Sequence, residues 1–242
     1  MLRFFRQIRK KLMEQNKVRA YIYYALGEIM LVMIGILLAL QVNNWNETRK
    51  IQSERVIFMA SIKQDLQADI TILRIFLDDV ENSYDELKSE RARINKLGFD
   101  RDSLINYAKN EINIFYYSFD GFNNNTYESL KTSGNLSLIN DPIKRELFEL
   151  SSLQASSSET NTSYTEAYLE KSLLLFSKYP TPVDFAFIQD GTAYDMIWNN
   201  VDDKELAQLI SMWGTSKANL FRSILRDYTP VLEKTTSILE RF

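Results

Sequence analysis

The stretch AYIYYALGEIMLVMIGILLALQV, residues 20–42, decides how this chain is interpreted. Glu28 is its only charged residue, and every residue from Ile29 to Leu40 is apolar. At about 1.5 Å per residue, a helix of this length spans roughly 34 Å, enough to cross a hydrocarbon core of about 30 Å. The stretch therefore predicts a transmembrane helix over residues 20–42.

The charges on either side of this stretch differ sharply. Residues 1–19 contain seven basic residues against one acid, a net charge of +6, whereas residues 43–242 contain 22 basic residues against 30 acidic ones, a net of −8. Basic flanks stay on the cytoplasmic side of a membrane, so we expect a cytoplasmic N-terminus and a periplasmic domain over residues 43–242. The basic residues expected at the membrane surface are Arg3, Arg6, Arg9, Lys10, Lys11, Lys17 and Arg19.

The leader, residues 1–19, also has an apolar periodicity. Leu2, Phe5, Ile8 and Leu12 recur every three or four residues, which predicts a short amphipathic helix lying on the inner leaflet with its cations near anionic headgroups. A basic cluster is also typical of nucleic-acid binding, but its position beside an apolar span favours the membrane, and we expect no nucleic-acid partner.

Two alternatives to a membrane anchor are weaker. A cleaved signal peptide would end in a small-x-small site, and the sequence after Ala39 offers none. A buried helix of a soluble protein would have to place the +6 leader directly against a long apolar run. Tyr21 and Tyr24 at one end and Trp45 at the other also match the aromatic belts of a span.

Glu28 is the residue of the span most open to a functional interpretation. Helical spacing places it on one side with Gly35 and Ala39, and the small pair Gly35-x-x-x-Ala39 permits close helix contact. An intramembrane carboxylate suggests proton or ion coupling in a multi-helix assembly. The simpler interpretation is that Glu28 reaches the inner headgroup zone or pairs with a basic residue such as Arg19.

Beyond the span, residues 36–97 contain neither Gly nor Pro, so the helix is expected to continue past the bilayer. A seven-residue apolar repeat over this stretch predicts a bundle or coiled-coil seam. Its members are Met59, Leu66, Leu73, Val80, Leu87 and Ile94, with Ile70, Leu77 and Tyr84 in the second apolar position.

The remaining segments predict an all-α fold, one N-terminal transmembrane helix continuing into an antiparallel helical bundle. Gly98 should end the long helix, and Asp102 or Ser103 should cap a short one. The aromatic segment 114–119 is expected to be irregular. Further helices are expected from Thr126 to Gly134, from Asn140 or Asp141 to about residue 178, and from Asp202 or Asp203 to about residue 241, with a kink at Pro230. A long connection is expected between the last two, from residue 179 to residue 200.

One part of the predicted helix 141–178 is unusual. Its middle, ASSSETNTS at residues 155–163, contains no large apolar residue. We expect either a frayed section or a small-molecule site between helices. We call residues 155–163 the polar waist.

The composition excludes many enzyme classes. The chain has no Cys and no His, so it lacks thiol nucleophiles, the commonest general base and the commonest transition-metal ligand. The segment DGFNNN at 120–125 lacks the ligand spacing of a calcium loop, and no glycine-rich phosphate loop is present. We therefore expect no enzymatic activity, no metal and no cofactor.

Two segments resemble a known family. The stretch ALGEIMLVMIGILLALQVNNWNE at 25–47, preceded by MLRFFRQIRKKL, and the stretch TYESLKTSGNLSLINDPIKRELFEL at 126–150 are similar to a family of Bacteroidota membrane proteins of unassigned function. The resemblance implies a single-pass inner-membrane protein of a Gram-negative bacterium with a helical periplasmic domain. It implies no substrate, partner or catalytic residue.

The sequence thus predicts a non-enzymatic, membrane-anchored scaffold, sensor or subunit of an envelope complex that acts through its periplasmic bundle. Its expected partners are the lipid bilayer and either a second copy of the chain or another membrane protein. The alternative is an ion-coupled or pore-forming assembly that uses Glu28.

Overall fold

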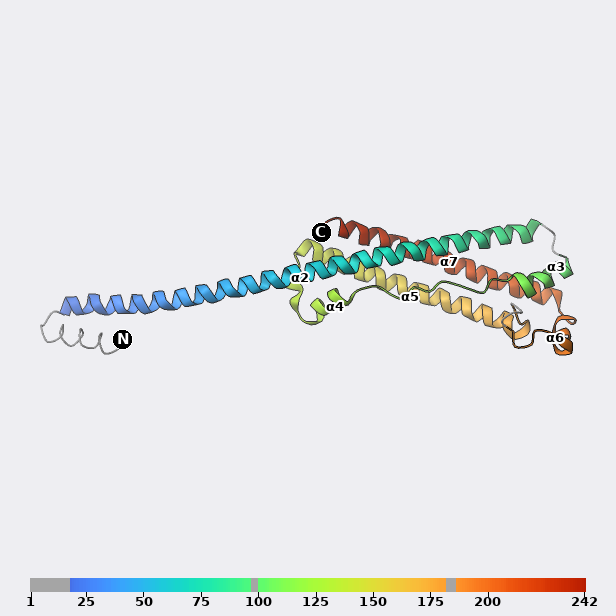
Figure 1. Cartoon of the computed structure of the whole chain (residues 1–242), viewed down its shortest axis with the longest axis horizontal. Helices are drawn as coiled ribbons and strands as arrows, with labels where there is room; N and C mark the ends of the chain where they lie inside the picture. Colours follow the sequence, from blue (N-terminus) through green and yellow to red (C-terminus); the bar gives the residue numbers. More distant parts are fainter. Residues whose placement is uncertain (1–17, 97–99, 182–185) are drawn as a thin grey trace. The chain divides into compact units, whose positions relative to one another are not determined.

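The structure, a computed structural model, describes residues 18–96, 100–181 and 186–242 (Figure 1). All regular secondary structure in these ranges is helical, which confirms the predicted all-α class. The chain divides into two compact units, residues 1–57 and 58–242. The helices are α2 (Val18–Lys96), α3 (Arg101–Asn106), the π-helical segment η1 (Tyr107–Glu111), α4 (Asn125–Thr132), the 3-10 helix η2 (Asn135–Leu138), α5 (Asp141–Lys178), α6 (Gly191–Trp198) and α7 (Asp203–Leu239).

Helix α2 contributes to both units and has a different surface in each. In the first unit its large apolar side chains from Ile22 to Trp45 are exposed. In the second unit Leu66, Leu73 and Val80 are at most 4% exposed, which confirms the predicted apolar seam. The absence of Gly and Pro after Gly35 explains why the helix is uninterrupted to Lys96. The predicted break at Gly98 lies outside the described residues.

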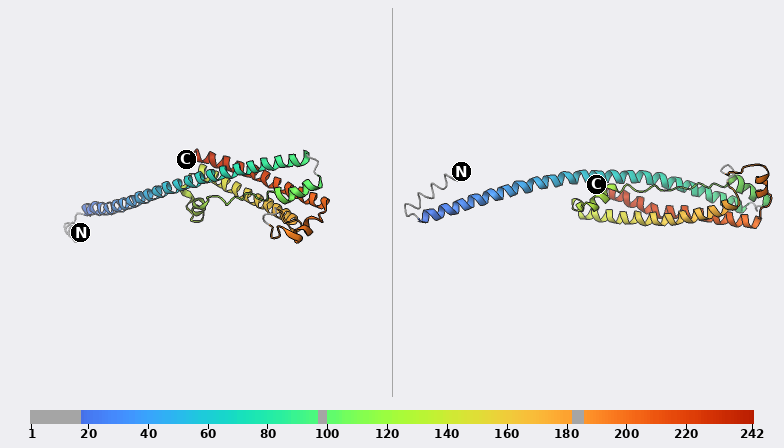
Figure 2. Two further views of the ribbon diagram at one scale, coloured as in Figure 1. Left: turned by 45° about the vertical axis from the view of Figure 1, so that its right-hand side comes forward. Right: turned by 90° about the horizontal axis from the view of Figure 1, so that it is seen from below.

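Three long helices form the second unit. Helices α5 and α7 are antiparallel neighbours, and the part of α2 after residue 57 runs beside them in the same direction as α5 (Figures 1 and 2). Two consecutive long helices can run in the same direction only if the connection between them returns along the bundle. Residues 100–140 make this return, through α3, η1, an extended segment, α4 and η2.

The extended segment, residues 112–124, is the least regular part of the return and is called the strap here. Because it has no strand partner, its backbone groups need side-chain partners. All three long helices supply one. The Asp69 carboxylate of α2 accepts from the Asn123 amide at 2.8 Å, and Tyr168 of α5 donates to the Ile114 carbonyl at 2.5 Å. Lys217 of α7 donates to the Asn113 carbonyl.

Aromatic side chains of the strap fill the space between the helices. The Phe119 ring lies 5.2 Å from both the Phe76 ring of α2 and the Tyr228 ring of α7. The Tyr116 ring lies 5.4 Å from that of Tyr168. The predicted irregular conformation of residues 114–119 is therefore confirmed, and Ile114, Tyr116 and Phe119 of this segment pack against the hydrophobic core.

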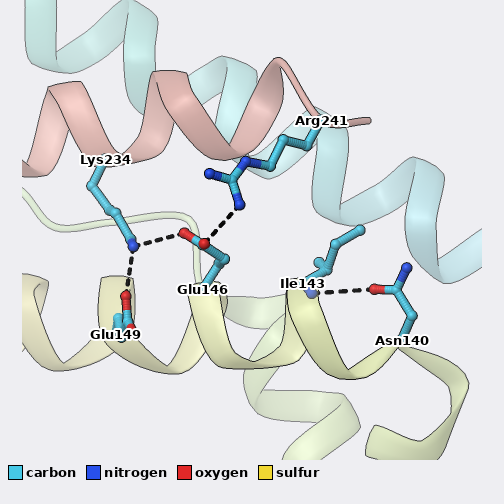
Figure 3. Close-up of polar contacts among 6 residues, drawn as sticks. All are labelled: Asn140, Ile143, Glu146, Glu149, Lys234 and Arg241. Carbon is cyan, nitrogen blue, oxygen red and sulfur yellow. Dashed lines mark hydrogen bonds and ion pairs between the residues drawn. The ribbon is translucent and has the colours of Figure 1, made fainter.

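The caps of the two later long helices follow the sequence prediction. The Asn140 side chain accepts from the Ile143 amide at 3.2 Å, as Figure 3 shows, and Pro142 occupies the first turn. The Asp202 side chain accepts from the Glu205 amide at 3.0 Å. Helix α7 runs through Pro230 and ends at Leu239.

Three local predictions are wrong. Helix α3 begins one residue before Asp102, because Asp100 accepts from the Ser103 amide at 2.8 Å and supplies the cap. Thr126 lies inside α4, whose start is instead held from α2 by Asp65, which accepts from the Thr126 amide at 3.4 Å. The connection expected over 179–200 contains the short helix α6.

An ion-pair network joins α5 and α7 at the end of the bundle where α7 ends (Figure 3). Lys234 lies 2.7 Å from the carboxylate of Glu146 and 2.6 Å from that of Glu149. Arg241 lies 2.7 Å from the other oxygen of Glu146. The two cations lower the pKa of Glu146 below its ordinary value. This pairing favours the observed register of the two antiparallel helices.

Candidate functional site

The predicted membrane residues all lie on α2 where they are described. Glu28 and Tyr24 are half-buried, whereas Ala39 and Trp45 are exposed. Arg19 is exposed, and Tyr21 is helical. The other basic residues assigned to the membrane surface, Arg3, Arg6, Arg9, Lys10, Lys11 and Lys17, lie outside the described residues, as does the predicted amphipathic leader helix.

Gly35, the first residue of the small-x-x-x-small pair, has open space beside it. A methyl group built on Gly35 would meet no atom of the described chain within 4 Å. Among the described residues, one helix is long and apolar enough to cross a membrane, with a mean hydropathy of 2.2 in its most apolar window. No residue of that window is buried in the single chain, so it is unlike the core helix of a globular domain.

The polar waist is not frayed. It is continuously helical within α5, and Ser157 and Asn161 are buried. Ser157 donates to the Asp227 carbonyl of α7 at 3.0 Å, and Gln154, just before the waist, donates to Asp69 of α2 at 3.4 Å. Ser157 and Gln154 therefore hydrogen-bond to the neighbouring helices across the interior.

A hollow lined by both apolar and polar side chains lies elsewhere, between α2 and α7. It has a volume of about 500 Å³, within the range of small-molecule sites, and we call it the α2/α7 cavity. Helix α7 turns a row of small residues toward it, which leaves room between the helices. The small residues are Ala207, Ser211, Gly214 and Ala218, and the apolar lining is completed by Leu87, Ile94, Leu104, Ile210 and Trp213.

The polar lining of the α2/α7 cavity is mainly cationic. Lys88 is paired with Asp85 and lies 4.7 Å from the centre of the Tyr84 ring. Arg222 donates to the Tyr84 hydroxyl at 3.4 Å. Arg91 and Arg222 are exposed, and neither forms an ion pair with an acid in the described part of the chain. Two guanidinium groups on this lining are therefore not neutralised.

Glu90, the one acid of the lining, belongs to a buried cluster with Tyr107 and Lys217. Burial raises the pKa of Glu90, while a hydrogen bond from Tyr107 and the charge of Lys217 act in the opposite direction. Burial, and then the neighbouring Glu90, raise the pKa of Tyr107. Burial lowers the pKa of Lys217 to about 8, although Glu90 and Glu86 favour its charged form.

Lys217 is enclosed on the side facing the strap. It is 4% exposed, and its ammonium lies 5.4 Å and 5.6 Å from the ring centres of Trp213 and Phe221. Its hydrogen bond goes to the Asn113 carbonyl. This arrangement suits a structural cation that fixes the strap and balances Glu90.

A second acidic cluster, Asp65 and Asp69 on α2, is also structural. Asp69 is 1% exposed and accepts from the backbone amide and side chain of Asn123 at 2.8 Å and 2.7 Å. Burial raises the pKa of Asp69 despite these hydrogen bonds. Among the described residues, no three Asp or Glu side chains are placed to hold a metal ion.

Sequence reasoning missed the α2/α7 cavity and its buried cluster, although one signal was available. Lys217 lies at helical spacing between Trp213 and Phe221, within the apolar face of α7. A cation at such a position requires an interior partner. Neither the identity of this partner nor the hollow beside it follows from spacing along one helix.

Comparison with known proteins gives one match. Residues 28–146 match DUF6090, a family of unknown function, in agreement with the expected resemblance to a family without an assigned function. The match begins at Glu28 on α2 and ends in the second turn of α5. No curated protein and no solved structure matched the chain. Over about half its length, this chain is therefore similar to a family whose function is not assigned.

Proposed function

We propose that this chain is a single-pass inner-membrane protein whose helical domain, residues 58–242, lies in the periplasm and binds a ligand or partner there. The proposal rests on the apolar segment of α2, of which no residue is buried in the single chain. Exposing so much apolar surface to water would be strongly unfavourable, and a lipid bilayer removes it from water.

The orientation rests on charge. The +6 leader belongs on the cytoplasmic side, and residues 43–242, which carry a net charge of −8, on the other. The absence of His and Cys from the sequence removes the commonest catalytic groups. The buried ionisable groups Asp69 and Lys217 hold the strap. A binding, scaffolding or sensing role therefore fits these residues better than catalysis.

Association through the Gly35 face is the part of this proposal most directly testable by mutation. We expect Gly35→Leu to block close helix contact and reduce the oligomeric fraction at least threefold, because Leu fills the space that a neighbouring helix would occupy. The measurement is the mass of the complex after extraction into lipid nanodiscs, set against 28.3 kDa for one chain.

Gly27→Leu is the matched control. Gly27 also has no atom within 4 Å of a built methyl group, but its direction around the helix differs from that of Gly35 by about 80°. The control should keep the oligomer. A wild-type protein that is monomeric in nanodiscs, or equal loss in both variants, would contradict association through Gly35.

The second candidate function is an ion-coupled assembly built on Glu28. It is favoured by the position of this acid on the same side of the helix as Gly35, where a partner helix would lie. Glu28→Leu removes the charge and the hydrogen-bonding groups, whereas Glu28→Gln removes only the charge. Loss of ion flux in reconstituted vesicles with both variants, despite normal insertion, supports ion coupling. Flux equal to wild type in Glu28→Leu contradicts it.

A further inference from the structure

We propose that the α2/α7 cavity binds an amphipathic anion, a single apolar chain with a carboxylate or phosphate head. This inference goes beyond the proposed membrane anchorage and does not depend on the orientation of the chain, because every lining residue lies in the second unit.

The apolar part of the ligand is specified by the interior of the cavity. Leu87, Ile94 and Leu104 line one side, and Ile210 and Trp213 line the other. A volume of about 500 Å³ accommodates a small lipid-like molecule rather than a single ion. Burial of an apolar chain against these side chains contributes favourable free energy at roughly 25 cal/mol per Å².

Gly214 shows that the hollow opens directly over the backbone of α7. A methyl group built there would meet no atom within 4 Å, although Gly214 is half-buried and Trp213 beside it is 1% exposed. The hollow is therefore open beside the backbone of α7, with room there for the chain of a ligand.

The sign of the ligand's charge follows from the polar lining. Arg91 and Arg222 form no ion pair with an acid in the described part of the chain, and the Tyr84 hydroxyl accepts from Arg222 at 3.4 Å. Glu90 does not cancel them, because it is engaged by Tyr107 and Lys217. A guanidinium presents a fork of donors that matches a carboxylate or a phosphate. Ser211, Thr215 and Asn219 add hydroxyl and amide donors to the lining.

The experiment is photolabelling of the full chain reconstituted in phosphatidylcholine vesicles. The probes are a diazirine-bearing long-chain carboxylate and the amine of the same chain length, and labelled peptides are mapped by mass spectrometry. We expect the carboxylate to label residues 87–95 and 207–222, and the amine to label them at least tenfold less. Labelling confined to residues 20–42 would show only partition into the bilayer and would overturn the proposal.

Two sets of variants test the site itself. Gly214→Phe fills the cavity and should reduce carboxylate labelling at least tenfold, whereas Met212→Phe, the matched control at an exposed position of α7 outside the lining, should leave it unchanged. Arg91→Gln combined with Arg222→Gln should reduce carboxylate labelling at least fivefold without changing that of the amine. Both arginines are exposed, so this variant remains informative if Gly214→Phe fails to fold. Unchanged labelling in the arginine variant overturns the anionic assignment.

Unlabelled competitors, added to the photolabelling reaction, identify the head group that the cavity binds. Unlabelled palmitate offers a free carboxylate, and a single-chain lysophosphatidic acid offers a lipid phosphate. Displacement of the carboxylate probe by either competitor supports the proposal, and the competitor that displaces it identifies the head group as a carboxylate or a phosphate. Failure of both to displace it would overturn the proposal while leaving the membrane anchorage untouched.

Discussion

Lys217 lies in the interior of the second unit, and its contribution to the free energy of unfolding depends on pH. Burial lowers its pKa to about 8, from 10.5 for an exposed lysine. Between these two values Lys217 is neutral in the folded protein and protonated in the unfolded chain. Unfolding then takes up a proton, so raising the pH across this window favours the folded state. Below about pH 8 the lysine is protonated in both states, so it no longer makes the free energy of unfolding depend on pH.

We expect the wild type to gain free energy of unfolding relative to Lys217→Met as the pH rises from 8 to 10.5, by at most about 3 kcal/mol. The comparison with the variant cancels the titration of other groups, including the buried tyrosines. Urea unfolding of the reconstituted full chain, followed by tryptophan fluorescence at several pH values, measures this difference. A difference independent of pH would show that Lys217 is not desolvated as described.

At the scale of elements, the strap is the feature that determines the bundle's topology. It returns the chain so that α2 and α5 run in the same direction, and each long helix supplies a buried polar side chain to its ends: Asp69, Tyr168 and Lys217. The strap therefore depends on groups that are individually unfavourable to bury.

Asp69→Ala should reduce the free energy of unfolding by about 2–4 kcal/mol, because the amide and side-chain donors of Asn123 lose their acceptor in a buried site. Asp69→Asn keeps one acceptor oxygen and should cost less. The measurement is the urea midpoint of the reconstituted full chain.

Glu81→Ala is the control, since Glu81 is an exposed acid on the same helix and its loss should change stability by no more than about 0.5 kcal/mol. Equal midpoints for Asp69→Ala and Glu81→Ala would show that Asp69 does not hold the strap.

The sequence predicted the features that depend on residues close to one another in the chain. The seven-residue repeat identified the buried seam of α2, and Asn140 and Asp202 were found as caps because an N-cap acts within three residues. The start of α4 was misplaced because Asp65, far away in the sequence, accepts from its first turn. The strap and the α2/α7 cavity were missed for the same reason, since both depend on contacts between helices distant in the chain.

At the scale of the whole molecule, the central claim is that residues 20–42 cross the membrane with the helical domain on the outer side. The chain has no native cysteine, so a single introduced cysteine reports its own location. Lys204→Cys places a thiol at an exposed position near the start of α7, and Lys10→Cys places one in the basic leader.

A maleimide that cannot cross membranes, applied to spheroplasts of a Gram-negative host, tests this claim most directly. We predict labelling of Lys204→Cys in intact spheroplasts and labelling of Lys10→Cys only after lysis. Labelling of Lys10→Cys but not of Lys204→Cys before lysis would reverse the orientation. Labelling of both only after lysis, with the protein recovered in the soluble fraction, would contradict the membrane anchor itself.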